Sequence, residues 1–176
     1  MTAHGRPARC DESGDVGRLA VYACELAAFD GTDLEDERSF EEVERFILSI
    51  AAGPWWTGPM VTVRRARAGT ASSVAAGSVG RAGAPTEIRL ADSQCTVATG
   101  AHELAHALAG VERGHDAVFR RAYLDVVAMG TNVDPLERRG TTHVDQLADA
   151  FASAGLALAE RRWPPPDAGT VGAIAL

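Results

Sequence analysis

Two histidines and a glutamate lie close together in the segment His102-Glu103-Leu104-Ala105-His106. If this segment is helical, residues four apart share one face, so His102 and His106 can direct their imidazole nitrogens at one metal ion. Glu103 is rotated by about 100° from His102 and can reach a water on the metal without binding the metal itself. This HExxH spacing predicts a zinc site at which Glu103 acts as the general base.

The remaining protein ligand must come from outside the HExxH segment, because a catalytic zinc ion commonly takes three protein ligands and a water. His115 is the preferred candidate, since it lies nine residues beyond His106 and follows a turn bounded by Gly110 and Gly114. Three imidazoles favour zinc over magnesium or calcium, so we expect one Zn²⁺ per chain. The alternatives for the third ligand are Glu112, Asp116, His143 and Asp145. Glu112 or Asp116 could instead form a hydrogen bond with one of the metal ligands.

Other site residues follow less directly from the sequence. A second polar group often stabilises the negative charge that develops on a substrate oxygen, and Tyr123, Arg120 and His143 are candidates for it. A strand predicted at 86–90 is expected to form, or to lie beside, a sheet edge that receives a peptide substrate. The pair Trp55-Trp56 can line a pocket, although packing in the core or in a lid is the commoner role of such residues.

The order of predicted elements is two helices, three strands and three helices. Ser39 and Glu42 form a capping box at the start of the second helix, and Gly110 is placed to end the helix that carries the HExxH segment. We therefore expect an α+β fold, in which a short, mostly antiparallel sheet packs on that helix with further helices around it. The predicted helices span about 15–27, 39–50, 95–109, 116–129 and 142–162. The predicted strands span 60–64, 73–79 and 86–90.

Composition and charge exclude several classes of protein. The chain has 176 residues and a net charge of −7, and all 17 basic residues are arginine, so it lacks the basic surplus of a nucleic-acid-binding protein. It has no apolar run of the roughly 20 residues that span a bilayer, and its first residues lack the apolar segment of a secretory signal, so we expect a cytoplasmic protein. Its three cysteines form no CxxC pair and no disulfide framework. The predicted organisation is a flexible leader at 1–14, one domain at 15–163 and a Pro-rich tail at 164–176.

The HExxH segment, followed by Gly114-His115-Asp116-Ala117-Val118-Phe119, resembles the HExxH…HGxxF pattern of SprT/Spartan-type zincins. It resembles more closely a family of small metallohydrolases from GC-rich actinobacteria. Weaker similarity is found at 21–25, 54–56 and 61–64, within a stretch from about 16 to about 130. The resemblance implies a compact zincin core with His115 as third ligand. Asp116 replaces the Gly of the pattern, and no Cys-rich or basic extension is present, so DNA-dependent proteolysis is not expected.

These features predict a zinc-dependent metallohydrolase, most simply a metallopeptidase that acts on a peptide or a small amide. One alternative is a metalloenzyme that acts on a small molecule in a biosynthetic pathway. Another is a non-catalytic module whose structural metal and acidic surface bind a partner, but such a module would not need a general base at Glu103. No nucleic-acid or membrane partner is expected, and the sequence leaves the natural substrate and the oligomeric state open.

Overall fold

The computed structural model describes residues 17–75, 85–131 and 142–166. The predicted leader at 1–14, positions 76–79 of the second predicted strand and most of the predicted tail lie outside these ranges. Within them, the predicted order of two helices, three strands and three helices is confirmed, with two short 3₁₀ helices added. The elements are α1 (Arg18–Phe29), α2 (Phe40–Ala51), β1 (Val61–Arg65), β2 (Ser73–Ala75), β3 (Thr86–Leu90), η1 (Asp92–Gln94), α3 (Val97–Ala109), η2 (Val111–Arg113), α4 (Ala117–Gly130) and α5 (His143–Ser153).

The three strands form a mixed sheet in the order β1-β3-β2. β2 runs antiparallel to β3, as predicted, but β1 runs parallel to β3, with Val63 opposite Ile88. The prediction of a mostly antiparallel sheet is therefore wrong for one of the two strand pairs. Successive strands do reverse direction along the chain, so β1 and β3 point the same way. They become a parallel pair because β3 inserts between β1 and β2 instead of following β2 at the edge.

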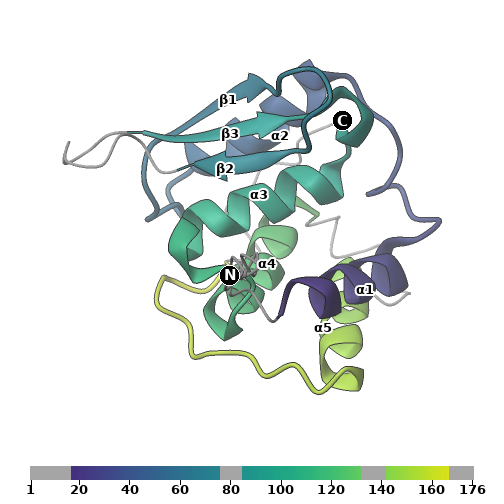
Figure 1. The fold of residues 1–176 in the computed structure, drawn as a ribbon. Helices are drawn as coiled ribbons and strands as arrows, with labels where there is room; N and C mark the ends of the chain where they lie inside the picture. Colours follow the sequence, from purple (N-terminus) through teal and green to yellow (C-terminus); the bar gives the residue numbers. More distant parts are fainter. Residues whose placement is uncertain (1–16, 76–84, 132–141, 167–176) are drawn as a thin grey trace, which may run out of the picture.

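Helix α3 lies between the sheet and α4, while α1 and α5 pack against each other to one side (Figure 1). Helix α2 packs on both β1 and α3. Gly100 permits the close approach of α2 and α3, because a Cβ at this position would lie 2.8 Å from Cγ1 of Val43. The core is continuous through these layers and includes Phe46 of α2, Ile88 of β3 and Leu104 of α3. The result is a small α+β domain with α3 at its centre.

The helix starts follow the caps in the sequence. The capping box of Ser39 and Glu42 is present at α2, and the side chain of Thr96 accepts the N–H of Thr99 at the start of α3. Gly110, with φ +104°, follows the last residue of α3 as predicted. In the described part of the chain, no helix is both long and apolar enough to cross a membrane.

The last helix is shorter than predicted. We expected it to run to Arg162, but α5 ends at Ser153. Gly155 adopts φ +69°, and the N–H groups of Gly155 and Leu156 donate to the carbonyl oxygens of Ala152 and Phe151. These bonds form a Schellman motif, in which a glycine in the left-handed conformation ends the helix well before the prolines that we took as its stop.

The segment after α5, which we call the C-terminal strap (residues 156–166), packs on α4 without regular secondary structure. The carboxylate of Asp125, buried on α4, accepts two hydrogen bonds from the Arg161 guanidinium, at 2.6 and 3.0 Å, and one from the indole of Trp163 at 2.9 Å. The indole of Trp55 donates to the carbonyl oxygen of Pro164 at 2.8 Å. The strap is therefore held to the domain at several points along its length.

Candidate metal centre

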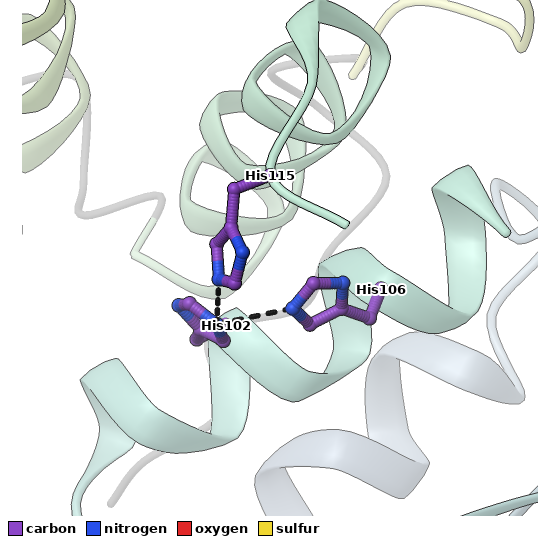
Figure 2. A group of neighbouring side chains, drawn as sticks. All are labelled: His102, His106 and His115. Atoms are coloured by element: carbon purple, nitrogen blue, oxygen red, sulfur yellow. Dashed lines mark hydrogen bonds between the residues drawn. The ribbon is translucent and has the colours of Figure 1, made fainter. Parts of the chain in front are cut away.

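The three histidines that the sequence indicates as metal ligands lie together. His102 and His106 occupy successive turns of α3, and His115 comes from the segment that leads into α4, with its ring directed at the other two (Figure 2). The Nε2 atom of His102 lies 3.2 Å from Nε2 of His106 and 3.1 Å from Nε2 of His115. All three side chains are buried. Within the described ranges they form the one group of three or more potential ligands whose ligand atoms all lie within 4.8 Å of one another.

These distances suit a bound metal ion. Three nitrogens about 2.05 Å from a tetrahedral zinc lie about 3.3 Å apart. Hydrogen bonding alone explains the cluster less well, because one imidazole nitrogen offers a single lone pair or a single N–H, and Nε2 of His102 faces two other rings. The group could therefore hold a metal ion, and imidazole donors suit zinc, copper, iron or nickel.

Two glycines shape the turn that brings His115 back over α3. Gly110 and Gly114 have φ values of +104° and +54°, which side-chain-bearing residues rarely adopt. The short helix η2 lies between them, and Asp116 then caps α4 by accepting the N–H groups of Val118 and Phe119. The predicted turn is therefore present. Because Asp116 has a negative φ, this position does not need the Gly of the resembled pattern.

Glu25 of α1 contacts the metal-ligand cluster, and our sequence analysis did not identify it as a site residue. Its carboxylate forms a short hydrogen bond with Nδ1 of His102. A carboxylate on the second nitrogen of a metal-binding imidazole fixes the tautomer and the orientation of the ring. The contact joins residues 77 positions apart, so no local spacing could reveal it.

Glu103 lies on α3 beside the histidines and is only 8% exposed. Burial raises the pKa of its carboxyl to about 7, opposed by the charge of His102 and reinforced by that of Glu25. A group with a pKa near neutrality is well suited to accept and return a proton at neutral pH. The position and the electrostatics of Glu103 are therefore compatible with the predicted role of general base.

A cavity of about 240 Å³ opens beside the cluster. Tyr22 of α1 forms part of its wall, with its ring centroid 5.6 Å from that of His102 and 5.4 Å from that of His115. Tyr22 is 45% exposed, so it stands between the histidines and solvent. The lining residues are Tyr22, Glu25, Glu35, Ala71, Ser72, Gln94, Ala98, Thr99, His102, Glu103 and Tyr123.

Tyr123, Arg120 and His143 were considered for stabilising the negative charge on a substrate oxygen. Of these three, only Tyr123 lines this cavity. Its side chain is fully buried, its hydroxyl donates to the carbonyl oxygen of Ala98 at 3.4 Å, and burial raises its pKa well above the usual value. Arg120 instead donates to the backbone carbonyl oxygens of His115 and Ala157. His143 lies on α5 against the ring of Phe29, away from the cavity lining.

The remaining candidates are placed elsewhere by the structure. Asp116 and Asp145 cap helices, and Glu112 is an exposed residue of η2, so none of these carboxylates joins the histidine cluster. Trp55 is buried in the core, and Trp56 donates through its indole to the carbonyl oxygen of Pro59. Neither tryptophan lines the cavity, in agreement with the packing role considered the commoner one.

No family model, curated protein or solved structure matches the chain. The resemblance to small metallohydrolases therefore rests on the motif residues. The structure adds the α+β fold and a buried three-histidine group that could hold a metal ion.

Proposed function

We propose that this protein is a zinc-dependent hydrolase of amide bonds, most simply a metallopeptidase. One observation carries the proposal: three buried imidazoles converge beside the buried carboxylate of Glu103, next to a cavity that both His102 and Glu103 line. A purely structural metal site would need neither the carboxylate nor the cavity.

His102, His106 and His115 would hold the metal, which supplies Lewis acidity and makes a water molecule acidic enough to ionise at a pKa of about 7. Glu103 accepts the proton of the attacking water and returns it to the leaving nitrogen. Glu25 would keep the proton of His102 on Nδ1, which would leave the Nε2 lone pair available to hold the metal. Tyr22 lies at the exposed side of the cavity, where its hydroxyl can donate to the carbonyl oxygen of a substrate.

A peptide substrate would approach along β2. We expected β3 to form or to adjoin the receiving edge, and β3 pairs with strands on both sides, so within the described ranges it offers no free edge. β2 is its antiparallel neighbour, and Ala71 and Ser72, just before β2, line the cavity. An extended peptide added beside β2 would therefore pass the histidine cluster.

Metal content and the Glu103→Gln variant test this function. We expect one zinc ion per chain in the wild type, and we expect Glu103→Gln to retain the metal but to lose at least about 10²-fold in kcat, because the general base is removed. Glu112→Gln, an exposed carboxylate in the adjoining turn, is the matched control and should leave both unchanged. Absence of zinc from purified protein, with no uptake on addition of zinc, would falsify the proposal.

The size of the cavity favours one second candidate, an enzyme that acts on a small molecule. A volume of about 240 Å³ is below the range of about 300–1,000 Å³ that is usual for drug-sized ligands, so it suits a compact substrate. Digestion of a peptide library distinguishes the two functions. Turnover of small amides without cleavage of any peptide would favour the small-molecule enzyme.

A further inference from the structure

The cavity beside the histidine cluster is acidic. Glu25, Glu35 and Glu103 all line it, while its other lining side chains are neutral or imidazole. No arginine lines the cavity, and the sequence contains no lysine. Elsewhere in the described structure acidic groups often pair with arginine, as Glu87 does with Arg64 and Arg89. Glu25 contacts His102, whereas Glu35 and Glu103 line the cavity without an arginine partner in the described structure.

In the proposed site, one of these three carboxylates is not needed to balance the charge of the metal. Three neutral imidazoles and a divalent metal would carry +2, which the carboxylates of Glu25 and Glu103 would balance when both are ionised. Glu35 remains, an exposed residue of the segment between α1 and α2 that lines the open side of the cavity, and its side chain has no hydrogen bond or ion pair within the described residues. Burial raises the pKa of Glu35, and the charges of Glu25 and Asp30 raise it further. A positive charge placed here would relieve this repulsion.

Glu103 gives an independent indication that the cavity is built for a ligand. Its side chain is 8% exposed and lines the cavity, yet within the described part of the chain it makes no hydrogen bond. The carboxylate oxygens of Glu103 are open to the cavity, so their hydrogen bonds must come from whatever occupies the cavity. A polar molecule in the cavity would provide the missing partner.

We infer that the cavity selects substrates that carry a positively charged group close to the scissile amide, with Glu35 as the residue that recognises this charge. The inference rests on the proposed hydrolase function. The group is an ammonium or guanidinium, which can belong to a basic side chain or to the free α-amino group of the substrate. Glu103 and the metal act on the amide, and Glu35 binds the charge at the rim of the same cavity.

Binding of three hydroxamates, which use the metal but require no turnover, tests the inference. The probes are N-acetyl-lysine hydroxamate with a charged side chain, norleucine hydroxamate with a charged α-amino group, and the neutral N-acetyl-norleucine hydroxamate. For zinc-loaded wild type we expect calorimetry to show that one charged probe binds about tenfold more tightly than the neutral one. Which probe it is identifies the source of the charge. Glu35→Gln should abolish this difference, while Glu37→Gln, an exposed carboxylate of the same segment, should preserve it.

Peptide cleavage gives a second readout on the same variants. Wild type should cleave bonds beside lysine, arginine or a free amino terminus about tenfold faster, in kcat/KM, than bonds in citrulline, norleucine or acetylated analogues. Glu35→Gln should lose the preference, with kcat/KM on basic substrates falling to the level of the neutral analogues, whereas Glu37→Gln should keep the wild-type preference. Equal binding of all three hydroxamates to zinc-loaded protein, or a preference that survives Glu35→Gln in a folded variant, overturns this inference alone. Failure to take up zinc overturns the proposed function and, with it, this inference.

Discussion

At the level of single residues, Glu25 is a side chain of α1 that forms a hydrogen bond with a proposed metal ligand, His102. The variant Glu25→Gln removes the negative charge from the side chain that hydrogen-bonds to Nδ1 of His102. The tautomer of the His102 ring is then stabilised less. We expect zinc affinity to fall by about 10- to 100-fold, as measured by competition with a chromophoric chelator. Glu44→Gln on α2 provides the control and should bind zinc as wild type does. Unchanged affinity in Glu25→Gln would show that the contact does not support the metal.

Tyr22 and Tyr123 both line the cavity, but their surroundings differ. Tyr22 is partly exposed, and Tyr123 is fully buried with its hydroxyl on the carbonyl oxygen of Ala98. We expect Tyr22→Phe to lower kcat by about 10²-fold with zinc affinity unchanged, because it removes the proposed donor to the substrate oxygen.

Tyr123→Phe serves as the comparison for Tyr22→Phe. We expect it to lower the free energy of unfolding by about 1 kcal/mol, since it removes a buried hydrogen bond, and to affect kcat less. Steady-state kinetics and urea unfolding of both variants separate the two effects. The reverse order of effects on kcat would assign the catalytic role to Tyr123.

The sequence predicts the three histidines and Glu103 because their arrangement is local. HExxH places two imidazoles on one helical face, and the glycines on either side of η2 indicate the turn that returns His115. Tyr22, Glu25 and Glu35 could not be predicted in the same way. They reach the site through the packing of α1 and of the segment after it against α3, which depends on contacts between distant parts of the chain.

At the level of elements, Arg120 links α4, the C-terminal strap and the third histidine. Its buried guanidinium donates to the backbone carbonyl oxygen of His115 at 2.7 Å and to that of Ala157, in the strap, at 2.9 and 2.7 Å. Gly17, just before α1, packs against the same His115 carbonyl, because a Cβ there would lie 2.8 Å from the oxygen. The backbone of His115 is thus held between α1 and α4.

We therefore expect Arg120→Ala to lower zinc affinity by about tenfold, because His115 loses the group that positions its backbone. Arg121→Ala is the matched control, since within the described residues Arg121 donates to the carbonyl oxygen of Ala159, also in the strap, and not to His115. Competition with a chelator measures the zinc affinity of both variants, and circular dichroism verifies that both are folded. Equal losses in both variants would mean that the strap as a whole, and not Arg120, supports the site.

The boundaries of elements were predicted correctly where a capping residue determines them. The predictions were wrong where long-range packing or an overlooked turn determines the structure. Ser39 correctly marked the start of α2, and Gly110 correctly marked the end of α3. The end of α5 was predicted from the prolines at 164–166, whereas Gly155 ends the helix first. The insertion of β3 between β1 and β2 has no local signature, since strand order is set by how the sheet packs on α2 and α3.

For the whole molecule, the proposed zinc ion joins α3 to the start of α4 and should stabilise the folded state. A ligand at 100 times its Kd adds about 2.7 kcal/mol to the free energy of unfolding. For a chain of 176 residues this raises Tm by about 5–11 °C. Scanning calorimetry of metal-free and zinc-loaded protein measures the shift. His115→Ala should greatly reduce it, and a wild type whose Tm does not respond to zinc would contradict the prediction.

The separation in sequence between the proposed ligands and their support has a consequence for the order of folding. His102, His106 and His115 lie within α3 and the turn that follows it, whereas Glu25 is 77 residues away from His102. Short loops close at a lower entropic cost and earlier than long ones. We therefore expect the α3–α4 hairpin to capture its metal before α1 docks, so that the ion becomes a nucleus around which the rest of the chain assembles. Pulsed hydrogen exchange during refolding with and without zinc can follow this order.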